Sequence, residues 1–114
     1  MIKNSIVLVP FPFDDFLVSK VRPALCLTSE IGRYHHVIIA FISSKMPDDL
    51  NDSDLIIRKG SENSSGSGLT VDSVIRLHKI VTIPKYLIQR KLGSINKALE
   101  SEVSKKIKQL FDIE

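Results

Sequence analysis

Hydrophobic positions along the chain fall into short runs rich in β-branched and aromatic residues, as is typical of strands. They span residues 6–13, 24–27, 37–42, 55–57 and 73–83. Prolines at 10 and 12 cannot donate to a central ladder, so the first run is expected to reach a sheet edge or bend. The polar connection after it, with Asp14, Asp15 and Ser19, predicts a short hairpin to the second run.

Residues 37–42 and residues 60–68 predict a buried strand and a surface loop, respectively. Residues 37–42 are so apolar that both faces of that strand should be covered, and the run ends at Ser43-Ser44. Residues 60–68, GSENSSGSG, predict a mobile surface loop within one domain.

Alternation along residues 73–83 predicts which side chains share a face of that strand. Period two places Val74, Arg76 and His78 on one face, with Ile75, Leu77 and Lys79 on the other. Arg76 and His78 are therefore expected to be neighbours on one surface.

Helical spacing appears only near the end of the chain, where Asn96 is a candidate N-cap and lysines follow in the last turns. The apolar positions with this spacing are Ile95, Ala98, Leu99, Val103, Ile107, Leu110 and Phe111. An amphipathic helix covering one side of the sheet is expected. Five or six strands and one helix predict a mainly β fold, a small, strongly bent antiparallel sheet or barrel.

Length and charge narrow the class of protein. The 114 residues suit one domain, residues 1–114, and exclude large multi-domain enzymes. No apolar run reaches the roughly 20 residues that a bilayer needs, and residues 1–3 open no secretory segment, so no membrane contact and a cytoplasmic location are expected. The net charge of +3 is low for a dedicated duplex-DNA binder but compatible with weak, short contact to single-stranded nucleic acid.

Several kinds of chemistry have little support in the sequence. His35 and His36 are adjacent and point apart on an extended chain, which favours two surface histidines over a metal site. Cys26 lies in an apolar run, where a cysteine behaves as a small hydrophobe. The glycines at 66 and 68 lack the sequel of a phosphate-binding loop. No metal and no cofactor are predicted.

Polar residues at strand ends are the remaining candidates, each with two interpretations. Arg22 precedes a proline and is held extended, which suits phosphate binding or a surface ion pair with Asp14 or Asp15. Ser43 and Ser44 are either strand-end hydrogen-bonding groups or donors to a phosphoryl oxygen.

Arg76 and His78 also have two interpretations. They are either a polar pair on a half-exposed sheet face or a cation beside an acid/base group that titrates near neutral pH.

The order of these residues resembles the MazF/PemK family of toxin endoribonucleases from bacterial toxin–antitoxin pairs, in particular its PemK-like branch. The matching segments cover nearly the whole chain after residue 5. They are IVLVPFPF at 6–13, Asp15, KVRPAL at 20–25, ISS at 42–44, Gly68-Leu69, DSVIRL at 72–77, Thr82-Ile83, Leu92-Gly93 and the closing helix.

This resemblance implies an SH3-like barrel of the plasmid-maintenance-toxin type, a homodimer, and metal-independent cleavage of single-stranded RNA. It also implies a cognate antitoxin, with DNA contacted only through the antitoxin complex. Arg22 matches the catalytic arginine, Ser43 a strand-end threonine, and Arg76 an arginine near the scissile phosphate. With His78 these form the expected catalytic set. The residues expected to contact RNA are Asp15, Lys20, Ser44 and Lys79.

Departures from the family pattern occur at Asn4-Ser5, at Asp14, and at His78, where many members carry an acidic residue. A second interpretation is therefore a non-catalytic module of the same fold, either a gyrase poison like the related CcdB toxins or a degenerate toxin that only binds its antitoxin. A third is a housekeeping RNA-binding domain.

Overall fold

Six strands and one α-helix make up the part of the chain that the computed structural model describes, residues 2–10 and 21–114. Two short 3-10 helices, η1 (Glu62–Ser64) and η2 (Lys85–Leu87), lie in the connections, and α1 (Lys97–Leu110) follows the last strand. The strands are β1 (Ser5–Pro10), β2 (Val21–Cys26), β3 (His36–Ser43), β4 (Asp54–Ile57), β5 (Ser73–Pro84) and β6 (Arg90–Ser94).

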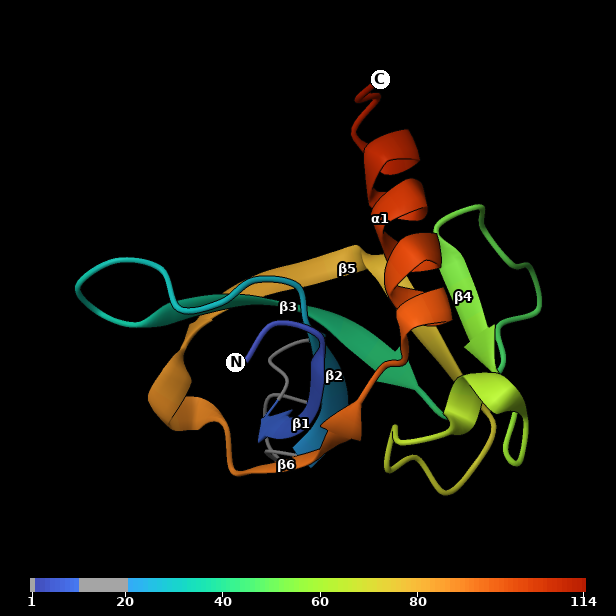
Figure 1. Cartoon of the computed structure of the whole chain (residues 1–114), viewed down its shortest axis with the longest axis horizontal. Coiled ribbons are helices and arrows are strands. Elements are labelled where there is room, and N and C mark those ends of the chain that lie inside the picture. Colours follow the sequence, from blue (N-terminus) through green and yellow to red (C-terminus); the bar gives the residue numbers. More distant parts are fainter. Residues whose placement is uncertain (1, 11–20) are drawn as a thin grey trace.

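The strands form one antiparallel sheet in the order β4-β5-β3-β2-β1-β6. The long β3–β5 pair spans the molecule, and the sheet bends around it, with β1, β2 and β6 grouped apart from β4 (Figure 1). The predicted bent antiparallel sheet with one helix is confirmed. β1 and β2 pair as expected for a hairpin, while Asp14, Asp15 and Ser19 of the predicted connection lie outside the described residues.

A bulge interrupts the β3–β5 pair and reverses the alternation of side chains. Ala40 lies opposite Ile80 but Phe41 lies opposite Arg76, so residues 77–79 of β5 have no opposite partner. Side chains alternate between the two faces of a strand, so an odd number of extra residues moves the following side chains of β5 to the opposite face of the sheet. Lys79 accordingly places its Nζ 5.8 Å from the centre of the Phe41 ring. The predicted placement of Lys79 with Ile75 and Leu77 was wrong, because regular alternation does not hold across the bulge.

Two hydrophobic cores lie on opposite faces of the bent sheet. The larger one includes Ile6, Leu25 and Ile75 and is covered by α1 through Leu99 and Val103. The second core comprises Val7, Val9, Ala24, Cys26, Val37, Ile39 and Ile83. Burial raises the pKa of the Cys26 thiol to about 11, against a lowering by the Lys91 charge, so Cys26 behaves as the small hydrophobe that the sequence predicts.

The helix covers the sheet through Leu99, Val103 and the partly buried Ile107, but its C-terminal end lies clear of the core. The predicted N-cap is confirmed, since the Asn96 side chain accepts a hydrogen bond from the Leu99 N–H at 3.0 Å. Leu99 and Val103 are buried, whereas Leu110 and Phe111 remain exposed, because α1 rises away from the sheet (Figure 1). The predicted apolar face is therefore buried only in part. No helix of the described chain is both long and apolar enough to cross a membrane.

The serine-rich segment 60–68 is a surface connection, as predicted, and it contains regular local structure that its composition did not predict. The hydroxyls of Ser61, Ser64 and Ser67 each donate to the carbonyl three residues earlier, at 2.6–2.8 Å, and Ser67 is fully buried. Gly68 has a φ of +76°, and a Cβ there would strike the Leu92 carbonyl. The Gly68-Leu69 and Leu92-Gly93 segments thus contact each other, which holds residues 60–68 against β6.

Candidate functional site

The register of the central strands places three predicted residues on one face of the sheet. Ala24 of β2 pairs with Phe41 of β3, and Phe41 pairs with Arg76 of β5. The β2–β3 register, continued by two residues, brings Arg22 opposite Ser43. Residues paired across strands, and those two apart on one strand, share a face. Arg22, Ser43 and Arg76 therefore lie on one face, with roughly 10 Å between β2 and β5.

A cleft of about 320 Å³ opens where these strands end, and we call it the strand-end cleft. Arg22 borders it, so this half-buried residue lies between the cleft and the shared face. The other polar side chains that line it are Ser44, Thr70, Ser73 and Arg90. Two guanidinium groups near several hydroxyls suit an anionic ligand such as a phosphate.

Ser43 itself is engaged at the end of its strand. Its hydroxyl donates to the Lys45 carbonyl and accepts from the Lys45 N–H, each at 3.1 Å. This is the strand-end hydrogen bonding that the sequence left open as one interpretation of Ser43. Ser44, by contrast, is exposed and lines the strand-end cleft, so the two serines have different surroundings.

Arg76 forms an ion pair with a buried carboxylate that sequence reasoning missed. Its Nε contacts Oδ1 of Asp54, whose side chain is fully buried, while 14% of the Arg76 side chain is exposed. Asp54 is the cross-strand partner of Arg76, and its other carboxylate oxygen accepts from the Asn51 N–H at 2.8 Å. A carboxylate held on both oxygens fixes the guanidinium beside it.

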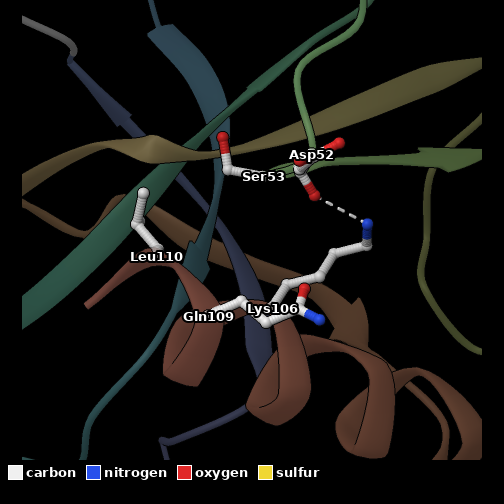
Figure 2. A pocket seen from close by; sticks show the side chains of 5 residues that line it. All are labelled: Asp52, Ser53, Lys106, Gln109 and Leu110. Atoms are coloured by element: carbon white, nitrogen blue, oxygen red, sulfur yellow. Dashed lines mark hydrogen bonds between the residues drawn. The ribbon is translucent and has the colours of Figure 1, made fainter. Parts of the chain in front are cut away.

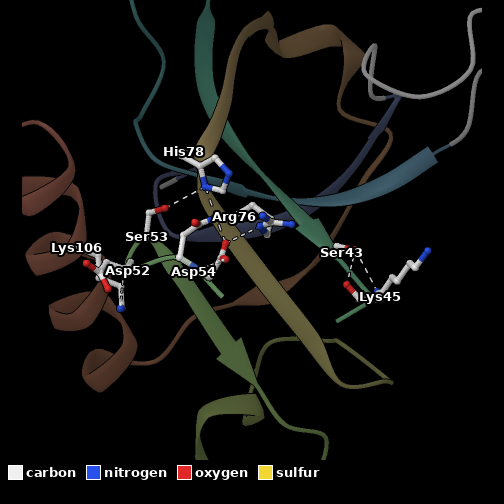
Figure 3. Close-up of polar contacts among 9 residues, drawn as sticks. Ser43, Lys45, Asp52, Ser53, Asp54, Arg76, His78 and Lys106 are labelled. Carbon is white, nitrogen blue, oxygen red and sulfur yellow. Dashed lines mark hydrogen bonds and ion pairs between the residues drawn. The ribbon is translucent and has the colours of Figure 1, made fainter. Parts of the chain in front are cut away.

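The ring of His78 lies beside this ion pair. Its Nδ1 lies 2.9 Å from the Ser53 hydroxyl and 3.9 Å from Oδ1 of Asp54, and 31% of its side chain is exposed. Figure 3 shows Ser53, Asp54, Arg76 and His78 turned toward one another, with Ser43 and Lys45 apart from them at the end of β3. We call these four residues the Asp54 cluster. The expected closeness of Arg76 and His78 is confirmed, with Asp54 between them.

A larger cleft of about 590 Å³ lies beside the Asp54 cluster, between α1 and the start of β4 (Figure 2). It is lined by Asp52, Ser53, Lys106, Gln109 and Leu110. Lys106 closes one side by donating to the Asp52 carbonyl at 2.8 Å. Among the residues that line this larger cleft, only Ser53 belongs to the Asp54 cluster, and none is a site residue predicted from the sequence.

The remaining predicted residues divide into two groups. Asp15 and Lys20 lie outside the described residues. Lys79 is exposed over Phe41, on the face that also holds Arg76. The sequence shows an acidic residue, Asp54, directly before the apolar run 55–57, as for a strand-end side chain. Nothing along the chain indicates that β4 pairs with the part of β5 that holds Arg76.

The histidine pair behaves as surface residues. His35 and His36 are both exposed, and His35 Nδ1 contacts Glu30 Oε1 at 2.8 Å. Among residues 2–10 and 21–114, no three His, Cys, Asp or Glu side chains gather in a way that would hold a metal ion.

The fold and the site together define a small, mainly β protein whose strand ends carry arginines and hydroxyls suited to phosphate groups. The model of the PemK-like, MazF-like toxins of type II toxin–antitoxin systems matches residues 3–111. The chain belongs to this family, which confirms the resemblance seen in its sequence.

Solved structures of similar fold agree with this assignment. The Mycobacterium tuberculosis toxin MazF-mt6 is 23% identical, with a TM-score of 0.71 over 96% of this chain and 98% of that one. A mycobacterial endoribonuclease in complex with its cognate antitoxin is 10% identical, with a TM-score of 0.70 over 100% and 97%. A search of curated proteins gave no match. At these identities the structures establish the shared fold.

Proposed function

We propose that this toxin is an endoribonuclease that cleaves single-stranded RNA through attack of a ribose 2′-hydroxyl on its own phosphate. The observation that carries the proposal is the placement of Arg22, Ser43 and Arg76 on one sheet face in a chain of this family. Similar structures that are named endoribonucleases support it.

The reaction needs a proton acceptor, a positive charge near the developing phosphorane, and a proton donor for the leaving oxygen. Arg22 and Arg76 supply the charge. The exposed Ser44 hydroxyl donates to a phosphoryl oxygen, or Ser43 does so after exchanging its hydrogen bond to the Lys45 carbonyl for one to the substrate. His78, with its ring neutral, accepts the proton of the attacking 2′-hydroxyl, and one of the two arginines donates a proton to the leaving 5′-oxygen. Asp54 acts through Arg76 by holding its guanidinium in place, so it is a positioning residue.

The substrate and partners follow from this chemistry. Requiring a 2′-hydroxyl selects RNA over DNA, with Asp15, Lys20 and Lys79 as further contacts to the strand. The toxin acts in the cytoplasm as a homodimer and is neutralised by a cognate antitoxin, and it meets DNA only in the antitoxin complex. One similar structure is a complex with an antitoxin, which supports this partner.

The test is incubation of the purified protein with a long single-stranded RNA in EDTA, followed by mapping of the cut ends. Specific cuts that leave a 5′-hydroxyl are expected. Arg58→Ala is the matched control, because Arg58 is an exposed arginine whose ion pair with Asp72 lies on the surface; it should cut as wild type does. Intact RNA in EDTA with folded protein would contradict the proposal.

A non-catalytic module that only binds its antitoxin is the second candidate. Two observations favour it: Ser43 is engaged with Lys45, and Arg76 is engaged with Asp54. Tight antitoxin binding without any RNA cleavage would establish this alternative.

A further inference from the structure

An aromatic cleft lies at the opposite end of β3 from Ser43. Tyr34 is 71% exposed and Tyr86 is 83% exposed, and they are the most exposed of the large hydrophobic side chains in the described chain. Both line a cleft of about 400 Å³ together with Glu30, His35 and Lys85. We call it the tyrosine cleft. Figure 1 shows the turn before β3 and the η2 segment at the same end of the molecule, away from β4.

The two segments that form this cleft are joined by polar contacts. Glu30 bridges them, because Oε1 contacts His35 Nδ1 at 2.8 Å and Oε2 accepts from Lys85 Nζ at 3.2 Å. The backbone adds a second link, from the Lys85 N–H to the His35 carbonyl at 2.9 Å. The hydrogen bond from Lys85 lowers the pKa of Glu30.

The backbone of the turn is also fixed in an uncommon conformation. His35 has a φ of 54°, in the left-handed region that few residues other than glycine adopt. Paired hydrogen bonds between Ile31 and His36, at 2.7 and 3.0 Å, close the turn. A fixed turn with exposed aromatic rings loses little entropy when a ligand orders against it.

We propose that the tyrosine cleft binds a base of single-stranded RNA, at a position remote from the cleavage site. This inference rests on the proposed function. A base has a π-face that stacks on a tyrosine ring, and its edge carries donors and acceptors. The cleft matches both features, with Tyr34 and Tyr86 as stacking surfaces and with Glu30, His35 and Lys85 as hydrogen-bonding groups. A protein partner would use the rings but would leave these charged groups to be desolvated.

The distance between the two sites sets the length of RNA that can use both. Seven residue steps along β3 separate His36 from Ser43, which corresponds to roughly 23 Å. Only a strand of several nucleotides can reach both ends. The tyrosine cleft therefore contributes to the binding of long RNA and adds nothing to cleavage chemistry.

The experiment measures the affinity of labelled 2′-O-methyl oligonucleotides of about 4 and about 16 nucleotides, which cannot be cut. With wild type, affinity should rise with length. Tyr34→Ala and Tyr86→Ala should each weaken binding of the long oligonucleotide about tenfold, whereas Tyr34→Phe and Tyr86→Phe should retain it. Phe111→Ala, which removes an exposed aromatic ring beyond the end of α1, is the control and should bind as wild type does.

Two results would overturn the proposal. One is unchanged affinity of both alanine variants for the long oligonucleotide. The other is a loss of affinity accompanied by a fall in the mass measured by sedimentation, which would make this surface a contact between protein chains. RNA cleavage assayed in parallel separates this inference from the proposed function. If the wild-type protein cleaves RNA but the alanine variants bind the long oligonucleotide as tightly as wild type, only the inference about the tyrosine cleft is contradicted. If binding depends on the tyrosines but the wild-type protein does not cleave RNA, only the proposed nuclease function is contradicted.

Discussion

Arg22 and Arg76 lie on the same face of the sheet, but their surroundings differ. Arg22 is half-buried and borders an open cleft lined by hydroxyls and a second arginine. Arg76 is largely buried, and its charge faces the carboxylate of Asp54. The space beside the two guanidinium groups is what differs: Arg22 borders a cleft that can admit a phosphate, whereas Arg76 is held in a fixed position by a buried carboxylate that offsets part of its charge. The resemblance places both arginines near the phosphate, and their different surroundings predict that they respond differently to substitution.

The largest effect should follow from loss of the cation at the strand-end cleft. Arg22→Ala is expected to lower the rate of RNA cleavage about 100- to 1000-fold, because the developing negative charge loses its main partner. The circular dichroism spectrum and the urea midpoint should stay near those of wild type. Cleavage by the variant at the wild-type rate would remove Arg22 from the mechanism.

The paired arginine should matter for stability as well as for cleavage. Arg76→Ala is expected to slow cleavage about 100-fold and to destabilise the fold by about 3 kcal/mol, because Asp54 is left as an unpaired buried charge. The double variant Arg76→Ala/Asp54→Asn should be more stable than Arg76→Ala alone in urea unfolding. Equal stability of the two would mean that the ion pair is not an energetic unit.

Asp54→Asn tests whether this carboxylate positions Arg76 for catalysis. Since the guanidinium would be less well fixed, kcat should fall about tenfold while KM changes less. A variant that is destabilised in urea yet keeps the wild-type kcat would give Asp54 a structural role only.

His78→Gln tests the acid/base role next to the same cluster. Glutamine keeps a hydrogen-bonding group toward Ser53 but cannot accept a proton, so the rate of cleavage should fall and the shape of the pH–rate profile should change while the fold is retained. An unchanged profile would leave His78 as a partner of Ser53 and Asp54 without a role in proton transfer.

The smallest effect is expected at Cys26. Its thiol is fully buried with a pKa of about 11, so it stays protonated and unreactive at neutral pH. Cys26→Ala should cleave RNA as wild type does, and a thiol reagent should label native protein far more slowly than protein in urea. Rapid labelling of the native thiol would contradict this account of the second core.

Much of the fold could be predicted because strand formation depends on local patterns. The apolar runs 37–42 and 73–83 became the central β3–β5 pair, and Asn96 caps α1 as expected. The bulge between Ala40 and Phe41 could not be predicted, since it depends on the register of two distant strands. The folded serine segment also depends on a distant contact, between Gly68 and Leu92.

The candidate site was predictable only where a residue's own neighbours in the sequence determine its place. Arg22, before a proline at the start of β2, and Ser44, after an apolar strand, both line the strand-end cleft. Asp54 could not be assigned to Arg76, because their pairing joins β4 to β5 across many residues. The tyrosine cleft was missed for the same reason, since Tyr34 and Tyr86 meet only through the fold.

The most direct test of the central claim removes one oxygen atom from the substrate. Once a cut has been mapped in EDTA, the same RNA is prepared with a 2′-deoxy sugar at the nucleotide on the 5′ side of that cut. If the 2′-hydroxyl is the nucleophile, cleavage at this position should be lost while cuts elsewhere continue. Cleavage at the 2′-deoxy position as fast as at the same position of the unmodified RNA would contradict the proposed mechanism.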